Sequence, residues 1–121
     1  MAEYKEFVEL IDHLIELTQE KQIKWAREYP PSSIITNSNR IKYVYTTEFN
    51  ERQLRVFEEM YKYYTDEDEF HWQTRTIVEF IDGEDSIFEF PQTSNSWDLL
   101  KAIQYRDVDI DGLMKNILKK K

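Results

Sequence analysis

The sequence predicts an α+β protein in which an antiparallel sheet of about four to five strands packs against N- and C-terminal helices. Apolar residues recur at helical spacing near both ends of the chain, and they alternate with polar residues through most of its middle. Helices that are segregated from a run of strands are typical of the α+β class. The 121 residues, 40% apolar and 15% aromatic, fit a single domain over 1–121 with a core of its own.

The first helix is predicted from the N-terminal segment and ends near "LTQEKQ", where the helical period is lost. Most of its acids fall on the face opposite the apolar residues. A short strand follows at "IKWARE", in which Ile23 and Trp25 share one face, and Pro30–Pro31 stops it. The apolar face of the helix consists of Tyr4, Phe7, Val8, Ile11, Leu14 and Ile15.

Two long strands are predicted next. The first spans about 41–49 and is rich in β-branched and aromatic residues. The second segment, "NERQLRVFEEMYKYYT" at 50–65, fits two interpretations. Asn50 and Gln53 would form a capping box for a helix, whereas the aromatic residues that follow favour a strand after a hairpin turn at Asn50–Arg52. We predict the strand, because a long strand lies on each side of it in the sequence.

The segment "FHWQTRTIVEFIDGEDSIFEFP" predicts a second hairpin. Its first part alternates regularly, with Phe70 and Trp72 on one face and His71 on the other. Asp82–Gly83 is a strong turn signal. The chain then returns as a short strand over about 87–90, which a proline ends.

Two helices are predicted to complete the chain. Ser94–Ser96 offer caps for the first, which carries Trp97, Leu100 and Ile103 at helical spacing. The second has an apolar stripe, and its lysines complement the C-terminal end of the helix dipole. That stripe consists of Ile110, Leu113, Met114, Ile117 and Leu118, and the lysines are Lys115, Lys119, Lys120 and Lys121.

The stretch "RDVDIDGLMKNIL" has the spacing that opens a calcium loop, because Asp107, Asp109 and Asp111 alternate ahead of a glycine. Such a loop ends in a glutamate that binds calcium with both carboxylate oxygens. Here Leu118 occupies that position and belongs to the apolar stripe. We therefore predict a helix start, with Asp109 as N-cap and Asp111 in the first turn. No metal site and no cofactor are predicted.

Four consecutive acids, 66–69, stand close to His71. Carboxylates beside an imidazole are able to bind a divalent cation or to orient the histidine for base catalysis. Four consecutive acids cannot all face one site, however, and the only other histidine is His13 on the first helix. We therefore interpret 66–69 as a solvated loop between two strands.

Aromatic residues are concentrated in the predicted strands. Most of them are expected to pack under the helices, but the abundance of tyrosine also fits a half-exposed face that binds a ligand or a protein. For a small-ligand pocket on this face the candidates are Tyr43, Tyr45 and Trp72. The whole set is Tyr43, Tyr45, Phe57, Tyr61, Tyr63, Tyr64, Phe70 and Trp72.

Composition disfavours several classes of protein. The net charge of -8 argues against direct nucleic-acid binding, and the absence of cysteine excludes disulfides and thiol chemistry and fits the cytoplasm. Only two glycines are present, and no Gly-rich phosphate loop or nucleophile motif occurs. From the residues of the N-terminal segment we expect neither a signal peptide nor a membrane span. An enzyme is therefore disfavoured, while exposed strand edges leave a homodimer open.

The phrases "LIELTQEKQIKW", "VEFIDGEDSIFEFP" and "WDLLKAIQYRDVDIDGLMKNIL" resemble a loose group of small bacterial proteins with no assigned activity. In that group a helix leads to an I-x-W strand, a late hairpin ends in an aromatic-Pro step, and helices end the chain. The resemblance covers most of the chain but rests on core and turn residues. It implies a fold and no function.

The leading functional prediction is a non-enzymatic cytoplasmic protein that binds another protein, one with a basic surface, through an acidic and tyrosine-rich surface. Small acidic domains of this kind are typical of immunity proteins, inhibitors and accessory modules of bacterial or phage systems. The alternatives are a small-ligand sensor and an acidic mimic of nucleic acid. The residues predicted to bind the partner are Asp66, Glu67, Asp68, Glu69, Tyr61 and Tyr63.

Overall fold

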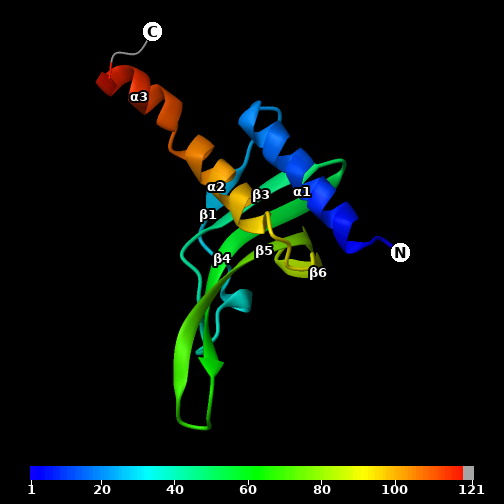
Figure 1. The fold of residues 1–121 in the computed structure, drawn as a ribbon, viewed down its shortest axis with the longest axis vertical. Coiled ribbons are helices and arrows are strands. Elements are labelled where there is room, and N and C mark those ends of the chain that lie inside the picture. The colour runs from blue at the N-terminus through cyan, green and yellow to red at the C-terminus, as the bar shows by residue number, and fades with distance from the viewer. Residues whose placement is uncertain (119–121) are drawn as a thin grey trace.

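A computed structural model of the chain describes residues 1–118 and confirms the α+β class (Figure 1). Within these residues one antiparallel sheet has the order β1-β3-β4-β5-β6, and the short β2 pairs with β4. The helices are α1 (Tyr4–Gln19), α2 (Ser96–Asp107), α3 (Ile110–Leu118) and the 3-10 turn η1 (Ser32–Ile34). The strands are β1 (Ala26–Glu28), β2 (Asn39–Arg40), β3 (Val44–Phe49), β4 (Arg52–Tyr64), β5 (Phe70–Asp82) and β6 (Asp85–Glu89).

The first helix forms as predicted. It begins with a capping box in which the Glu3 backbone N–H donates to the Glu6 carboxylate at 3.0 Å. Ile11 and Leu14 on its apolar face are fully buried. The buried Thr18 hydroxyl, near the end of the helix, accepts a hydrogen bond from the Trp25 indole at 3.1 Å. This bond ties the returning chain to the helix before β1 begins.

The ambiguous segment after residue 50 is a strand, as we predicted, and not a helix. Phe49 pairs with Arg52, so only Asn50 and Glu51 form the turn between β3 and β4. Both turn residues have positive φ, 52° and 63°, which is the backbone of the type I′ turn that two-residue hairpins favour. Asparagine tolerates this conformation better than most residues. Asn50 is therefore a turn residue and not the cap of a helix.

Several predicted boundaries differ from the structure. β1 begins only at Ala26, because the preceding Ile23 and Trp25 pack against the helix-side core and do not pair with a strand. The strand predicted from residue 41 begins at Val44. The second turn consists of Gly83–Glu84, since Asp82 and Asp85 pair across it.

Both faces of the sheet are partly covered. On one face, Val56 and Val78 pack with the apolar residues of α1 and α2 in the main core. On the other face, a second buried cluster is covered by residues that precede β3. This cluster consists of Val44, Phe57 and Ile77, with Ile34 and Ile41 packed against it.

A buried ion pair lies on this second face. The Arg55 guanidinium donates from Nε to the Glu79 carboxylate at 2.6 Å and from Nη1 to the Glu84 carbonyl oxygen at 3.2 Å. Arg55 is 2% and Glu79 is 3% exposed. The two residues are direct cross-strand neighbours on β4 and β5, so the register alone brings them together.

The predicted start of α2 is confirmed at Ser96, but the role of its cap differs. Asn95 occupies the N-cap position without a side-chain capping bond. Its amide nitrogen instead donates to the Val8 carbonyl oxygen at 2.9 Å and to the Asp12 carboxylate at 2.8 Å. Trp97, expected on the apolar side, is exposed, and the neighbouring Leu99 is buried in its place. Asn95 therefore docks α2 onto α1.

We expect Asn95→Ala to lower the free energy of unfolding by about 1–3 kcal/mol, because it removes two partly buried hydrogen bonds that join the start of α2 to α1. Urea unfolding followed by circular dichroism measures this. Asn37→Ala, at an exposed turn position, is the matched control and should stay close to the wild type. Equal losses in the two variants would contradict a docking role for Asn95.

Candidate functional site

The most prominent feature outside the core is a long hairpin formed by β4 and β5. Its two strands stay paired from the sheet to Tyr64 and Phe70, and Figure 1 shows them extending well past the helices. We call residues 58–76 the arm. A two-stranded hairpin is only marginally stable in water by itself, so this one depends on its cross-strand contacts and on β2, which pairs with β4 at Met60 and Tyr61.

The end of the arm is a five-residue turn, 65–69, and it contains the four predicted acids. The Glu69 carbonyl oxygen accepts hydrogen bonds from the backbone N–H groups of Thr65 at 3.0 Å and Asp66 at 3.3 Å. The Asp66 carboxylate accepts a further bond from the Glu67 N–H at 2.7 Å. The turn is closed by its own backbone, and all of its residues are exposed. The predicted solvated loop is confirmed in this respect.

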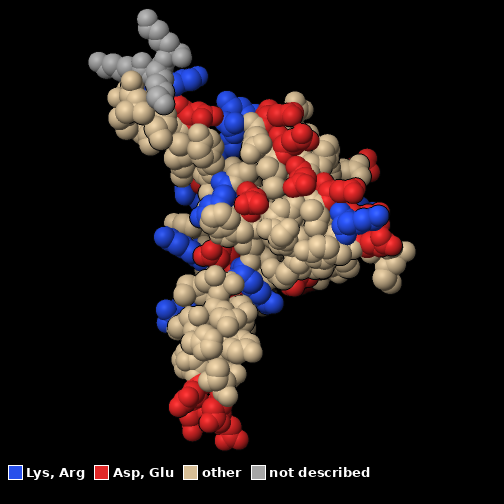
Figure 2. All heavy atoms as spheres, viewed as in Figure 1, with Lys and Arg blue, Asp and Glu red and all other residues tan. Residues whose placement is uncertain are grey.

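The charge on the arm is concentrated at this end. We call Asp66, Glu67, Asp68 and Glu69 the acidic tip, and Figure 2 shows it as a separate red patch at the end of a largely uncharged shaft. Across residues 1–118, none of these four carboxylates lies within ion-pair distance of a base. The arm as a whole has six acids and two bases.

One face of the arm contains the two tyrosines predicted for partner binding. The Tyr61 hydroxyl donates to the Gln73 amide oxygen at 3.0 Å, and the Arg75 guanidinium lies over the Tyr61 ring. Tyr63, closer to the tip, is about half exposed, and its ring centre lies 5.4 Å from that of His71. Tyr61 is thus engaged in the hairpin itself, whereas Tyr63 offers its ring to solvent beside the acidic tip.

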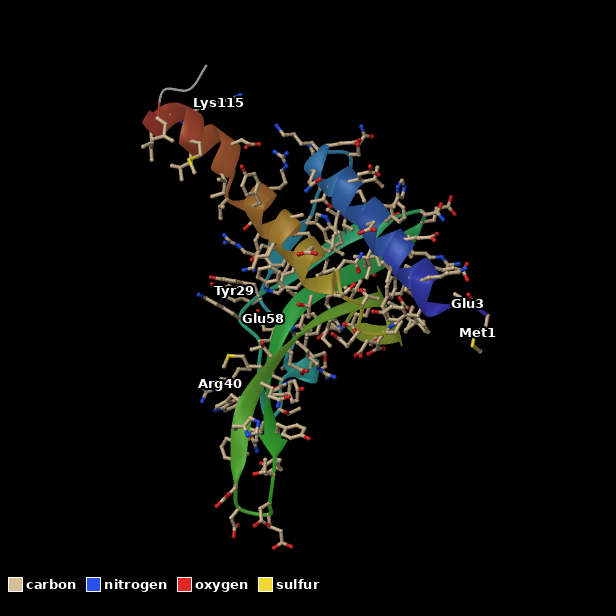
Figure 3. All side chains as sticks on the ribbon, in the orientation of Figure 1. Met1, Glu3, Tyr29, Arg40, Glu58 and Lys115 are labelled. Carbon is tan, nitrogen blue, oxygen red and sulfur yellow. The ribbon has the colours of Figure 1, made fainter. Side chains whose placement is uncertain are left out.

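The opposite face has a row of aromatic and basic side chains, of which our site prediction included only Trp72. Phe70 packs edge-on against Trp72, with ring centres 5.9 Å apart, and the Lys62 ammonium lies 4.6 Å from the Phe70 centre. Arg40, from β2, covers the Trp72 ring at 4.5 Å, and Figure 3 shows it alongside the shaft of the arm. Cation–π contacts of this kind contribute about 0.5–1 kcal/mol each at exposed sites.

Sequence alternation alone would have placed Phe70 and Trp72 on one face. Lys62 is the cross-strand partner of Trp72, a relation that follows only from the register. The position of Arg40 beside the arm could not be predicted from the sequence. It depends on β2, which is only two residues long, lies in an irregular segment and pairs with β4.

Of the three residues predicted for a ligand pocket, Tyr43 and Tyr45 lie at the main core, whereas Trp72 lies far from both. Tyr45 is a buried core residue, 5% exposed, and its register partner on β4 is Val56, which in turn pairs with Val78. Trp72 is six residues farther along β5, roughly 20 Å away at the rise of an extended strand. Burial raises the pKa of the Tyr45 hydroxyl, with a smaller contribution from the nearby Asp107 charge. Tyr43 packs instead against Tyr29, with ring centres 5.6 Å apart.

The three alternating aspartates each have a different partner. Asp107 forms an ion pair with Arg27 at 3.3 Å. The Asp109 carboxylate accepts the Gly112 N–H at 3.2 Å, which confirms its predicted role as N-cap. Asp111 accepts hydrogen bonds from Tyr105 at 2.7 Å and from Arg106 at 2.9 Å. In the part of the chain that the structure describes, no three or more His, Cys, Asp or Glu side chains are grouped so that they could hold a metal ion.

Comparison of the chain with known protein families, curated proteins and solved structures finds no match. The resemblance to small bacterial proteins therefore remains an expectation from the sequence phrases alone. No helix within residues 1–118 is both long and apolar enough to cross a membrane.

Proposed function

We propose that the protein binds another protein through the end of its arm, and that the partner presents a basic patch to the acidic tip. The observation that carries this proposal is the isolation of four exposed carboxylates, without a basic ion-pair partner in residues 1–118, at the far end of a projecting hairpin. Complementary charges of this kind accelerate encounter and select the partner.

The arrangement is difficult to explain by stability alone. Neighbouring like charges repel one another, and the tip lies beyond the helices that cover the core, so its acids do not contribute to core packing. An approaching basic surface would relieve this repulsion. The gain is greatest at low ionic strength, because exposed charges are screened over about 8 Å in physiological salt.

The aromatic residues beside the tip supply apolar contact area. Tyr63 and Phe70 lie on opposite faces of the arm directly above the acids, and both are more than 40% exposed. Aromatic residues are enriched in the buried centres of protein interfaces. We therefore assign Tyr63 and Phe70 to the contact with the partner, while Tyr61 supports the hairpin.

The geometry favours this function over the alternatives. An acidic mimic of nucleic acid would need charges in an extended row like phosphates, whereas the four acids of the tip are gathered at the end of the arm. A ligand sensor would need Tyr43, Tyr45 and Trp72 around one cavity, and Trp72 is roughly 20 Å from Tyr45 along the sheet. By analogy we place the protein among small acidic inhibitors, immunity proteins or accessory modules of the cytoplasm, a compartment with which its lack of cysteine is consistent.

The proposal predicts a salt-sensitive partner that is lost when the tip is neutralised. The tagged protein is used to capture binding proteins from lysate of the native host at low and at high salt. The variant Asp66→Asn/Glu67→Gln/Asp68→Asn/Glu69→Gln should lose at least about tenfold in affinity for the captured protein, which corresponds to about 1.4 kcal/mol. Calorimetry with the purified partner measures the change.

A matched control removes the same charge elsewhere. The variant Glu9→Gln/Glu20→Gln/Glu48→Gln/Glu89→Gln changes four exposed acids outside the arm and has the same net charge as the tip variant. It should keep the affinity of the wild type within about threefold. Equal losses would indicate a response to net charge, and unchanged binding by the tip variant would refute the proposal.

A further inference from the structure

A cavity of about 340 Å³ lies where the end of α1 meets the junction of α2 and α3. Figure 1 shows these helix ends close together, and the Arg106 guanidinium of α2 joins them by donating to the Gln19 carbonyl oxygen of α1 at 2.5 Å. Cavities that bind small molecules have volumes of about 300–1,000 Å³. The lining of this one, within residues 1–118, includes no residue of the arm, so the cavity is distinct from the surface proposed to bind a protein.

One wall of the cavity is apolar. Ile103 of α2 is 1% exposed, and Ile23 and Trp25, which precede β1, pack against the main core. The Trp25 indole N–H donates to the Thr18 hydroxyl at 3.1 Å, and that hydroxyl donates to the Leu14 carbonyl oxygen at 2.7 Å. The polar hydrogens of this wall are therefore already bonded within the protein. The wall offers apolar surface to a bound molecule.

The acids that line the cavity have partners of their own. Asp107 forms an ion pair with Arg27 at 3.3 Å. The Asp109 carboxylate accepts the Gly112 N–H at 3.2 Å as the N-cap of α3. Neither acid therefore neutralises a base that lines the cavity.

The bases that line the cavity are Lys21, Lys24 and Arg106. Arg106 donates to the Asp111 carboxylate at 2.9 Å, whereas neither lysine lies within ion-pair distance of an acid in residues 1–118. The hydrogen bond from Tyr105 is the main cause of the lowered pKa of Asp111, and the Lys21 charge is the smallest contribution. Two ammonium groups thus remain at the cavity without a carboxylate partner, in a chain whose net charge is -8.

Lys21 occupies a backbone position that disfavours lysine. Its φ is 62°, which lies in the left-handed region. The Gln22 N–H donates to the Leu17 carbonyl oxygen at 2.8 Å, and the Lys21 N–H donates to that of Thr18 at 3.1 Å. This is the Schellman pattern of a helix end, in which glycine is the common residue at the position of Lys21. The sequence therefore places a lysine side chain at the cavity at a steric cost to the backbone, and strain of this kind is concentrated at functional sites.

We propose that this cavity binds a small organic monocarboxylate with an apolar chain or ring. Its carboxylate would accept charge-assisted hydrogen bonds from Lys21 and Lys24, and its apolar part would cover Ile23, Trp25 and Ile103. A monoanion fits better than a phosphate dianion, because the two acids in the lining repel a second negative charge. The site is separate from the arm, so it stands or falls independently of the proposed protein partner.

Trp25 provides a reporter of binding inside the cavity. The chain has three tryptophans, so the variant Trp72→Phe/Trp97→Phe leaves Trp25 alone. Titration with acetate, butyrate, hexanoate and octanoate should change its fluorescence, and affinity should rise about threefold to fourfold for each added methylene that becomes buried. Hexylamine, of similar length and opposite charge, should bind at least about tenfold more weakly than hexanoate. Equal binding of hexylamine and hexanoate, or no response of Trp25 to octanoate, would overturn the proposal.

Lys21→Gly separates a binding role of this lysine from a structural one. Glycine suits the left-handed backbone, so the variant should unfold at a urea concentration no lower than the wild type, while its affinity for octanoate should fall about tenfold. A lysine that only complements the C-terminal end of the helix dipole would give the reverse result, namely lower stability and unchanged binding. That result would overturn the proposal.

Lys24→Gln and Lys115→Gln complete the test, because each removes one positive charge. Lys24 lines the cavity, whereas Lys115 lies on α3 outside it. Lys24→Gln should weaken octanoate binding about tenfold, and Lys115→Gln should bind as the wild type does within about twofold. Equal losses would indicate a response to net charge, and unchanged binding in both Lys21→Gly and Lys24→Gln would refute the site.

Discussion

Replacing Glu79 with alanine is expected to lower the free energy of unfolding by about 3–5 kcal/mol. The substitution leaves the Arg55 guanidinium buried without its carboxylate partner, and a buried charge that loses its partner is strongly destabilising. The remaining bond from Arg55 to the Glu84 carbonyl oxygen, at 3.2 Å, cannot neutralise the charge. Urea unfolding monitored by circular dichroism gives the difference from the wild type.

The same two strands provide a control. Arg75 on β5 donates to Glu59 on β4 at 2.8 Å, and its side chain is 42% exposed. Arg75→Ala should cost less than about 1 kcal/mol, because water screens the pair. The double variant Arg55→Met/Glu79→Leu should recover most of the stability lost in Glu79→Ala. Similar losses for Glu79→Ala and Arg75→Ala would show that burial does not set the strength of these pairs.

Leu99→Ala is expected to destabilise the protein by about 2.7–5 kcal/mol. Leu99 is fully buried where α2 meets the main core, and alanine would leave a cavity that the packed helices fill only in part. The size of the loss depends on how far α1 and α2 can close around it. Denaturant unfolding measures the loss of free energy. An unchanged dependence of that free energy on denaturant concentration shows that the variant still unfolds in two states.

Leu113→Ala is the corresponding control on α3. The same side chain is removed, but Leu113 is 47% exposed, so the expected loss is less than about 0.5 kcal/mol in dilute protein. A loss comparable to that of Leu99→Ala would mean that α3 packs on the body of the same molecule.

Most of the regular elements were predictable from the sequence because each has a clear period. The helical spacing in α1 corresponds to a real buried face, whereas the alternation in β5 identified a strand whose middle, Thr76–Glu79, is buried on both faces. The segment that became β4 was ambiguous because both of its faces carry large residues. The second face packs Phe57 under Ile34 and Ile41, so strict alternation was lost.

The covering of that second face could not be predicted. It depends on an irregular segment between β1 and β3 whose only regular pieces are η1 and β2. The burial of Arg55 and Glu79 follows from the same cause, because a sheet with one solvent-facing side would have left both charges in water. Trp97 was misplaced because its helical spacing is compatible with the core face, whereas Leu99 and Leu100 occupy that face.

The acidic tip was identified correctly as an exposed loop, since four consecutive charged residues cannot be buried. Its position at the end of a projecting arm came only from the structure, because sequence gives strand length poorly and gives no indication of which strands extend beyond the helices. The cation–π row of Lys62, Arg40 and Trp72 required the register as well.

The order of the strands has a consequence for how the chain folds. β3, β4, β5 and β6 follow one another as neighbours, and the loops that join them contain two, five and two residues. The entropy lost on closing a loop grows with its length, so these four strands assemble with little loss of chain freedom. Joining β1 to β3 encloses residues 29–43, and the helices must meet across the whole sequence. Those contacts join residues that are distant in the sequence, and contacts of this kind slow folding.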